Sequence, residues 1–318
     1  MLKLKAVAIL VLGISYSYAL DSTAFSRWNM SARAMGLNNN MVSLADDSNA
    51  LFFNPAGLSN VDHLEVLLNG SKVNWQSSNI SGERGCVAFS WPLFSDNHVA
   101  IGYTIFNDED ETALYREAQY VSGLSIRKRN LFAEGDSSLS FGVTLKMLEL
   151  TITDKVGTYS SDPVFKKGKD TKNTGDVGAL LMLGKLRTGI SGNNIILADF
   201  GVLAEDKVPW ELRIGSSYDA IEMKTSHVTP ILEYIRKTDD SRMSAACEIQ
   251  FSDSFVIRTG IDKDNISAGM SFGAIKPQCG RGTIMGGNME MRIDLGYNLP
   301  INMDGQTGSF LFGGIFRF

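Results

Sequence analysis

The side chains that could do chemistry in this chain are few and scattered. Only three of its 318 residues are histidines, His63, His98 and His227, and none stands at the spacing of a nucleophilic pair or a metal site. The sequence contains no G-x-S-x-G, no H-E-x-x-H and no phosphate-binding loop. Asp46 and Asp47 form a carboxylate pair suited to acid–base catalysis, but capping of a short helix explains them more simply. The sequence therefore predicts a protein that is not an enzyme and uses no metal or cofactor.

Charged residues recur instead on one side of several alternating segments. In residues 210–219, WELRIGSSYD, one side carries Trp, Leu, Ile and Tyr, and the other carries Glu, Arg, Gly, Ser and Asp. Residues 289–299 repeat this pattern. A side-chain period of two indicates β-strands with one apolar face. The other face is rich in Gly, Ser and Thr with acids and bases among them, which suits a crowded barrel interior better than the outside of a soluble sandwich.

Seven charged residues fall on this polar face and are candidates for the lining of the barrel interior. They could line a pathway, or they could form ion pairs between strands that hold the interior together, and the sequence leaves both alternatives open. The seven are Lys146, Arg213, Glu248, Arg258, Glu290, Arg292 and Asp294.

Turn signals such as DKDN at 262–265 divide the chain after residue 61 into about fourteen strands. An even number lets an up-and-down barrel close with both chain ends on one side. The predicted fold is all-β, a transmembrane antiparallel β-barrel over residues 61–318. Pro230 within a predicted strand indicates a bulge or kink. The predicted strands are 61–75, 84–92, 96–107, 112–128, 136–154, 172–187, 194–206, 209–220, 225–238, 241–251, 254–262, 264–276, 285–299 and 307–318.

The N-terminus has the order of a secretory signal peptide. Lys3 and Lys5 precede an apolar run over residues 6–14, and Ser17-Tyr18-Ala19 offers a small-x-small cleavage site. We therefore predict that residues 1–19 are a signal peptide. Its removal takes the formal net charge from -5 to about -7, because it removes two lysines and no acid. A negative charge argues against nucleic acid as a partner.

The three cysteines, Cys86, Cys247 and Cys279, are widely separated in this exported chain. An odd number without a repeated spacing is no disulfide framework. Cys247 lies on the apolar side of its strand, as a small hydrophobic residue would. A pair between Cys86 and Cys279 stays open.

In the last predicted strand, GSFLFGGIFRF, four phenylalanines share one face, and the fourth is the last residue of the sequence: Phe310, Phe312, Phe316 and Phe318. This pattern resembles the assembly signal at the C-terminus of outer-membrane barrels. The resemblance implies that the barrel-assembly machinery is a partner. A soluble edge strand this aromatic would invite aggregation.

The segment before the strands is predicted to fold into the barrel. A barrel of about fourteen strands is wider than its own side chains can fill. In LADDSNALFFNPAGL (residues 44–58) an acid can cap a helical turn over residues 48–53, proline ends the turn, and glycine permits the next one. We predict that residues 20–60 form an N-terminal plug, with a motif of Asp46, Asp47, Asn54, Pro55, Ala56 and Gly57.

Several short motifs resemble the PorV/PorQ proteins and their FadL-like (OMPP1/FadL/TodX) relatives. They are ARAMG at 32–36, LADD at 44–47, NPAGL at 54–58 and VPWELRIGSSY at 208–218. The resemblance implies a fourteen-stranded outer-membrane barrel with an N-terminal segment inside it. FadL-like members pass hydrophobic molecules, whereas PorV-like members handle proteins that emerge through type IX secretion.

The leading expectation is therefore an outer-membrane protein, surrounded by outer-membrane lipid, that passes hydrophobic small molecules or related cargo. The alternative is a non-transporting component of a protein-secretion or surface-attachment machine. A third hypothesis is an exported soluble β-protein. The first hypothesis predicts a hydrophobic ligand, and the second predicts a large protein partner.

Overall fold

The computed structural model describes residue 25 and residues 31–74, 81–94, 96–109, 111–132, 136–159, 161–201, 205–223, 226–238, 240–252, 254–273, 290–301 and 308–318. The predicted signal peptide and Cys279 lie outside these residues. None of the helices in the described part of the chain is long and apolar enough to cross a membrane.

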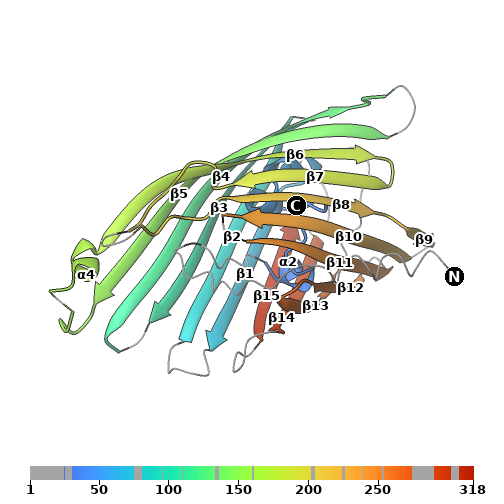
Figure 1. The fold of residues 1–318 in the computed structure, drawn as a ribbon. Coiled ribbons are helices and arrows are strands. Elements are labelled where there is room, and N and C mark those ends of the chain that lie inside the picture. Colours follow the sequence, from blue (N-terminus) through green and yellow to red (C-terminus); the bar gives the residue numbers. More distant parts are fainter. Residues whose placement is uncertain are drawn as a thin grey trace.

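The described strands form one antiparallel sheet that closes on itself (Figure 1). Each strand pairs with the next, β15 pairs with β1, and the short β9 continues the line of β8 along β10. The ring therefore has fourteen positions, and the predicted fold class is confirmed. The strands are β1 (Glu65–Asn74), β2 (Ser81–Phe94), β3 (Asn97–Glu109), β4 (Ala113–Arg129), β5 (Ser137–Asp154), β6 (Lys169–Leu183), β7 (Leu186–Asn193), β8 (Glu211–Tyr218), β9 (Ile221–Met223), β10 (Ser226–Lys237), β11 (Ser241–Ser252), β12 (Phe255–Ile261), β13 (Asn265–Phe272), β14 (Glu290–Pro300) and β15 (Ser309–Arg317).

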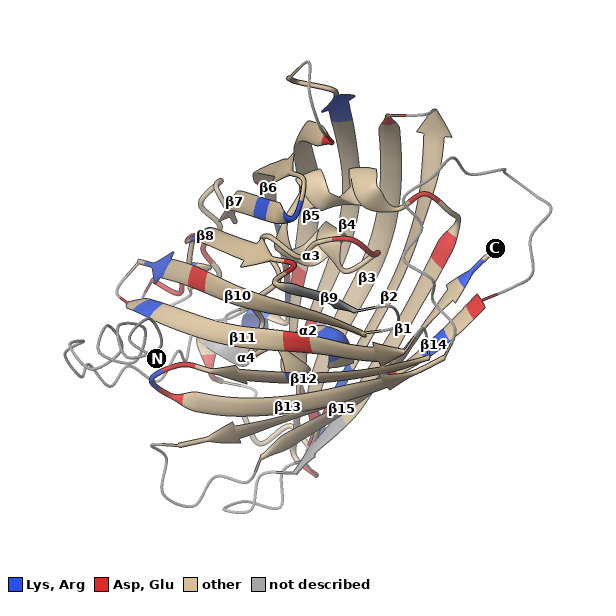
Figure 2. Ribbon diagram, turned by 90° about the vertical axis from the view of Figure 1, so that its right-hand side faces the viewer, with Lys and Arg blue, Asp and Glu red and all other residues tan. Residues whose placement is uncertain are grey.

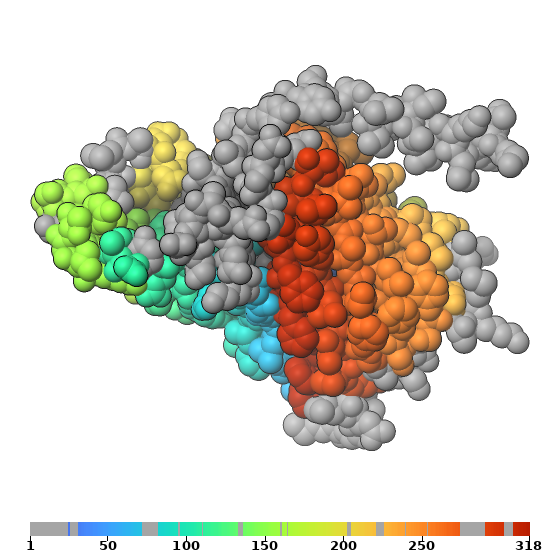
Figure 3. All heavy atoms as spheres, turned by 90° about the horizontal axis from the view of Figure 1, so that it is seen from below, coloured from blue at the N-terminus to red at the C-terminus, as the bar shows by residue number. Residues whose placement is uncertain are grey.

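We call the end of the barrel where β1 begins and Phe318 lies the terminal end, and the opposite end the loop end. The Phe318 amide donates to the Leu64 carbonyl, so the start of β1 and the end of β15 meet there. Seen from outside, the red C-terminal strands lie beside the cyan β1 and β2 (Figure 3). The short helix α4 (Pro163–Lys167) lies at the loop end, between β5 and β6 (Figure 1).

One predicted strand, 194–206, is wrong. The seventh strand is β7, which begins directly after a turn at Gly184, where the predicted strand 172–187 was expected to continue. Gly184 has a φ of 55°, which glycine adopts at little cost. Asn194 also has a positive φ and ends β7, so the apolar residues after it leave the sheet. An alternating pattern alone did not distinguish that segment from a strand.

A bulge of the kind predicted at Pro230 is found where β10 pairs with β8 and β9. Between the pairs Ser217–Ile231 and Ile221–Val228, three residues on the β8–β9 side oppose two on β10. Pro230 is one of those two. Because proline has no N–H to donate, the ladder is interrupted at this point.

The outward face of the barrel carries an apolar band, which is longest and unbroken on β5. On β5 the outward residues from Leu139 to Met147 are all apolar, and Glu149 follows them. These residues extend about 30 Å at about 3.3 Å each, or about 23 Å after a tilt of about 40°. Membrane barrels have an apolar band of about 25 Å. On β3 the corresponding change falls between Ile105 and Asn107.

The strands β3 to β6 continue beyond this band at the loop end. They have 13 to 18 residues, whereas β7, β8, β12 and β13 have only 7 or 8. The barrel wall is therefore tall on one side and short on the other (Figure 1).

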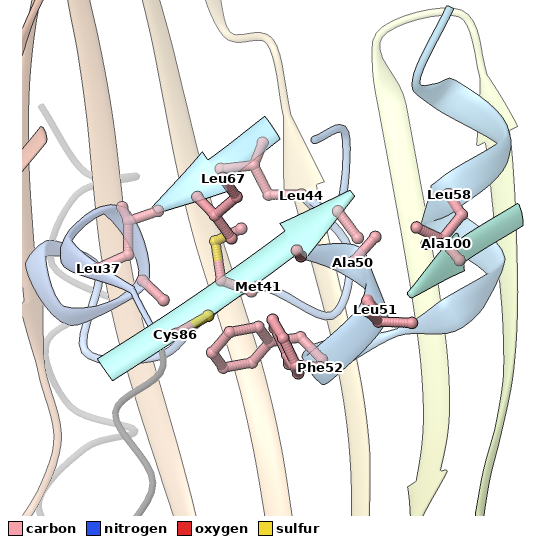
Figure 4. Close-up of a cluster of buried hydrophobic side chains, with 14 of the residues drawn as sticks. Leu37, Met41, Leu44, Ala50, Leu51, Phe52, Leu58, Leu67, Cys86 and Ala100 are labelled. Carbon is pink, nitrogen blue, oxygen red and sulfur yellow. The ribbon is translucent and has the colours of Figure 1, made fainter. Parts of the chain in front are cut away.

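Residues 31–60, which we call the internal segment, lie inside the barrel. They form α2 (Ala32–Gly36), α3 (Ala50–Phe53) and the 3-10 helix η1 (Pro55–Asn60). The helix α2 packs against β12 to β15, and η1 packs against β3 to β6. Apolar side chains of the segment, such as Leu37, Met41 and Phe52, cluster with Leu67 of β1 and Cys86 of β2 (Figure 4).

Inward-facing glycines make room for the internal segment. A Cβ built on Gly123 would lie 2.7 Å from Leu51, and one on Gly269 would lie 2.8 Å from the Cα of Gly36. Real Cβ atoms essentially never approach other heavy atoms that closely, so a larger residue would displace the segment. Nine strands contribute such a residue, and we call the set the glycine belt: Gly102, Gly123, Gly142, Gly178, Gly189, Gly215, Gly260, Gly269 and Gly296.

The substitution Gly142→Ala is expected to destabilise the barrel, because its Cβ would overlap the backbone of Pro55 and Ala56. Overpacking of this kind costs about 1–3 kcal/mol. The temperature at which the SDS-resistant form disappears on a heat-modifiability gel should fall. The matched control is Gly70→Ala on the outward face of β1, whose nearest contact would be 3.9 Å away. Equal temperatures for both variants would contradict the tight fit.

The structure places Phe310, Phe312 and Phe316 on the outward face of β15, with the exposed Phe318 directly after the strand, and removal of Phe318 is expected to slow assembly. The reason is that the chain would lose the terminal aromatic of the predicted assembly signal. The measurement is the amount of heat-modifiable protein in isolated outer membranes, with Phe318→Tyr as the variant that keeps an aromatic ring. Normal membrane levels of the truncated chain would count against the signal.

Candidate functional site

A buried ion cluster fastens the internal segment to the barrel wall. Arg33 of α2 donates to Asp46 at 2.5 Å and to Asp47 at 2.6 Å, and it also contacts Glu248 of β11 at 3.3 Å. Asp47 accepts in turn from Arg292 of β14 at 2.9 Å. We call these five residues the Arg33 cluster. Acidic and basic residues gather around α2 and α3 inside the barrel (Figure 2).

Asp47 is the centre of this cluster and is fully buried. Burial alone would raise the pKa of its carboxyl, but Arg33 and Arg292 hold that pKa well below its usual range. The carboxylate also accepts the Asn49 amide at 3.0 Å, so it supports the turn that leads into α3. Asp46 accepts from Arg33 and Arg187, and no cap bond is found for it. Of the two acids that could cap the helical turn, Asp47 is therefore the one that accepts a backbone amide, while the carboxylate of Asp46 pairs with arginines.

Asn54 and Pro55 fasten the other side of the segment. The Asn54 amide donates to the Val42 carbonyl at 2.8 Å and to the Ala179 carbonyl of β6 at 3.2 Å. Its oxygen accepts the Ala56 amide and so caps η1, in which Pro55 occupies the first position. Proline suits that position because its missing N–H would have no helical partner there. Pro55 therefore begins a second short helix where only an end was predicted.

Gly57 lies within η1 and not in the turn predicted for it. A Cβ at this position would overlap the backbone and side chain of Ala45. The residue therefore allows two parts of the internal segment to touch. Ala56, between Pro55 and Gly57, is fully buried.

Glu65 joins the internal segment to the seam between the first and last strands. Its carboxylate accepts the Ser48 amide at 2.7 Å and the Ser48 hydroxyl at 2.9 Å. Its other oxygen accepts from Arg317 of β15 at 2.6 Å. The side chain is fully buried. One carboxylate thus ties β1, β15 and the internal segment together.

Six of the seven predicted interior residues pair inside the barrel. Lys146 pairs with Asp176 of β6 at 2.7 Å, and Arg213 pairs with Glu233 of β10 at 2.8 Å. Arg258 pairs with Glu248 at 2.6 Å, while Arg292 pairs with Asp294 and reaches Asp47. Glu290 begins β14 at the terminal end and is half-buried. These contacts correspond to the alternative in which the charged residues form ion pairs that hold the barrel interior together.

A separate apolar group lies on the inward face of the tall wall, towards the loop end. Leu148 and Leu150 of β5 pack there against residues of the β7–β8 connection. The connection folds back on itself, because the Val208 amide donates to the Ala198 carbonyl at 2.8 Å. We call this group the inner apolar cluster: Phe25, Leu148, Leu150, Ala198, Phe200 and Val208.

The remaining groups that could bind a metal or react chemically are histidine, cysteine and carboxylate side chains. Within the described ranges, no group of three His, Cys, Asp or Glu side chains could hold a metal ion. His98 lies buried on the inward face of β3. Cys86 is a free thiol that packs against apolar side chains of the internal segment, and Cys247 lies half-buried on the outward face of β11.

Several residues that hold the internal segment in place were not predicted from the sequence. Arg33, Glu65 and Glu233 are all buried, and each contacts the internal segment or belongs to it. Arg33 lies in the ARAMG motif, and its position there was the available signal. The partners of the other two are far away in the chain, so no local spacing reveals them.

Comparison with known proteins shows the fold. No protein-family model and no curated protein sequence matches the chain. Among solved structures, the toluene transporter TodX of Pseudomonas putida is similar with a TM-score of 0.60 and 10% identity, covering 93% of this chain and 98% of that one. The CymD monoaromatic hydrocarbon channel has a TM-score of 0.56, 12% identity and coverage of 92% and 97%.

A FadL homologue of Pseudomonas aeruginosa is also similar, with a TM-score of 0.54, 10% identity and coverage of 90% of this chain and 96% of that one. At these identities the similarity concerns the fold. The chain therefore has the fold of FadL-like barrels. Its PorV/PorQ resemblance depends on the sequence motifs alone.

The substitution Asp47→Ala is expected to lower the free energy of unfolding by about 3 kcal/mol or more, because it leaves buried donors of Arg33 and Arg292 without this acceptor. Urea unfolding in lipid vesicles measures the change. Asp46→Ala is the control, since that carboxylate is 36% exposed and its ion pairs are screened. If both variants unfold at the same urea concentration, Asp47 is not the centre of the cluster.

Proposed function

We propose that this protein is an outer-membrane barrel that passes hydrophobic small molecules across the membrane, without enzymatic activity. The observation that carries the proposal is the inner apolar cluster, an apolar group inside the barrel that lies nearer the loop end than the Lys146–Asp176 ion pair. The toluene transporter TodX and the CymD monoaromatic hydrocarbon channel, which have the same fold, are named for hydrophobic compounds.

The outer-membrane location is supported by the outward face. Its apolar band on β5 has the height that a bilayer requires, and on β3 the outward residues likewise change from apolar to polar towards the loop end. Aromatic residues stand at the terminal end of this face, including Tyr218 and the neighbouring rings of Phe255 and Phe272, whose centroids are 5.3 Å apart. Such positions are typical of the interfacial girdles of membrane barrels.

The inner apolar cluster is an apolar region near the loop end whose side chains are buried against one another, with Tyr115 and Ile152 packed on it. Leu148 and Leu150 lie one and two inward positions beyond Lys146, whose ion pair with Asp176 marks the polar interior. A hydrophobic molecule that enters at the loop end therefore reaches these apolar side chains, beside the buried Glu117 of β4, before the Lys146–Asp176 pair. The exchange of water for such a surface contributes about 25 cal/mol for each Å² buried.

The internal segment acts as the plug in this proposal. It touches nine strands through the glycine belt and is held on opposite sides by the Arg33 cluster and by Asn54. Passage therefore requires local displacement of the segment. The side held by Asn54 has one bond from a charged donor, from Arg127 to the Asn60 side chain, and its bonds to β5 and β6 are neutral; neutral bonds contribute about 0.5–1.5 kcal/mol each. This side is the one that opens at lower cost.

The test is entry of the hydrophobic dye N-phenylnaphthylamine into cells or proteoliposomes that contain the protein. Entry should be faster than in empty membranes. Leu150→Asp should slow it, because a charge in the inner apolar cluster repels the dye, whereas Val156→Asp in an exposed loop should not. Asn54→Ala should speed it by loosening the segment from β6.

All variants must first show the heat-modifiable form, so that loss of entry is not loss of folding. Equal dye entry in the presence and absence of the folded protein would overturn the transport proposal. If a large protein partner also co-purified in equal amounts, the secretion or surface-attachment role would take its place.

A further inference from the structure

The β7–β8 connection exposes three consecutive apolar residues at the loop end of the barrel. Ile195, Ile196 and Leu197 are 51%, 54% and 72% exposed. We call them the apolar ridge. The next residue, Ala198, is buried in the inner apolar cluster. The chain therefore crosses from the outside of the barrel to the inside over the end of β7.

The height of the ridge follows from its contacts with β6. The Ile195 amide donates to the Gly175 carbonyl at 3.0 Å, and the Thr174 hydroxyl donates to the Ile196 carbonyl at 2.8 Å. Gly175 pairs with Leu145 of β5, an outward residue that is 69% exposed. The ridge therefore lies level with the top of the outward apolar band.

The side chain of Ile195 continues that band. A Cβ built on Gly192 would lie 3.3 Å from Ile195 Cγ2 and 3.7 Å from Val177 Cγ2, so both side chains flank Gly192 on one face. Val177 is an outward residue of β6. On the same face of β6, beyond this level, come Asn173, Thr171 and Lys169. The ridge thus stands at the boundary between the apolar and the polar parts of the outward face.

The connection is anchored from the inside as well. Asp176 accepts the Asn194 amide at 2.9 Å, and Lys146 donates to the Asn194 side chain at 3.2 Å. These bonds fix the residue directly before the ridge. On the other side of the ridge, the Phe200 amide donates to the Asp206 carbonyl at 3.0 Å. The three apolar side chains are held between two fixed points.

We propose that the apolar ridge is a lipid-contact site, whose side chains insert among the acyl chains of the membrane leaflet at the loop end. The occupant follows from the continuity of the ridge with Val177, which belongs to the apolar band. Its insertion removes a compact apolar patch from water. It also holds the non-strand connection against the membrane where β7 and β8 are short. This inference rests on the membrane-spanning barrel of the proposed function.

The experiment attaches a nitroxide to single cysteines of the full chain in phospholipid vesicles and measures its collision rates with oxygen and with a water-soluble nickel complex. The background carries Cys247→Ser and Cys279→Ser, while Cys86 is buried. The test variant is Leu197→Cys. The controls are Leu145→Cys within the apolar band and Thr171→Cys on the polar part of β6.

The expected oxygen-to-nickel ratio at position 197 is several-fold higher than at 171 and close to that at 145, because oxygen concentrates in the acyl region and the nickel complex in water. A ratio at 197 equal to that at 171 overturns the lipid contact while the barrel proposal stands. Low collision rates with both reagents at 197 also overturn it, since protein would then cover the ridge. A low ratio at 145 overturns the membrane barrel and the lipid contact together.

Discussion

A barrel of fourteen strands encloses more space than its inward side chains fill, and the structure depends on how that space is occupied. The internal segment occupies it, with backbone and small apolar side chains against a belt of glycines. Close packing of this kind leaves little tolerance for larger residues. The glycines on nine strands are therefore as much a part of the site as the segment that they contact.

Charge inside the barrel follows the same constraint. A guanidinium or carboxylate taken out of water is stable only with partners that satisfy it. The internal segment brings Arg33 and Asp47, and the wall brings Glu248 and Arg292, so each side neutralises the other. Glu65 adds a link to the seam between β1 and β15. The segment is thereby fastened to the wall by buried ion pairs as well as by packing.

The two sides of the barrel differ in height, and this difference organises the loop end. The tall wall of β3 to β6 carries apolar residues on its inward face beyond the ion pairs. The short strands β7 and β8 leave the β7–β8 connection to complete the wall beside it. The same connection supplies the outer ridge and part of the inner apolar cluster. A single stretch of chain therefore contacts both the membrane side and the interior.

By itself the sequence determined the class of fold, the positions of most strands and the direction of their side chains. These features depend on a side-chain period of two, which is local and survives without an alignment. The four C-terminal phenylalanines were predicted to share one face for the same reason, and Phe310, Phe312 and Phe316 lie on the outward face of β15. Local pattern failed for residues 194–206, because apolar residues in a connection that crosses the wall have the same composition as a strand.

Only the tertiary structure decided what the polar residues do. Six of the seven predicted interior residues form ion pairs, mostly with partners on neighbouring strands or in the internal segment, as Lys146 does with Asp176. Arg33 and Glu248 are separated by 215 residues in the chain, and Ser48 and Glu65 meet only when β1 turns back past the segment. Spacing along the chain holds no information about such pairs, because closure of the barrel is what brings them together.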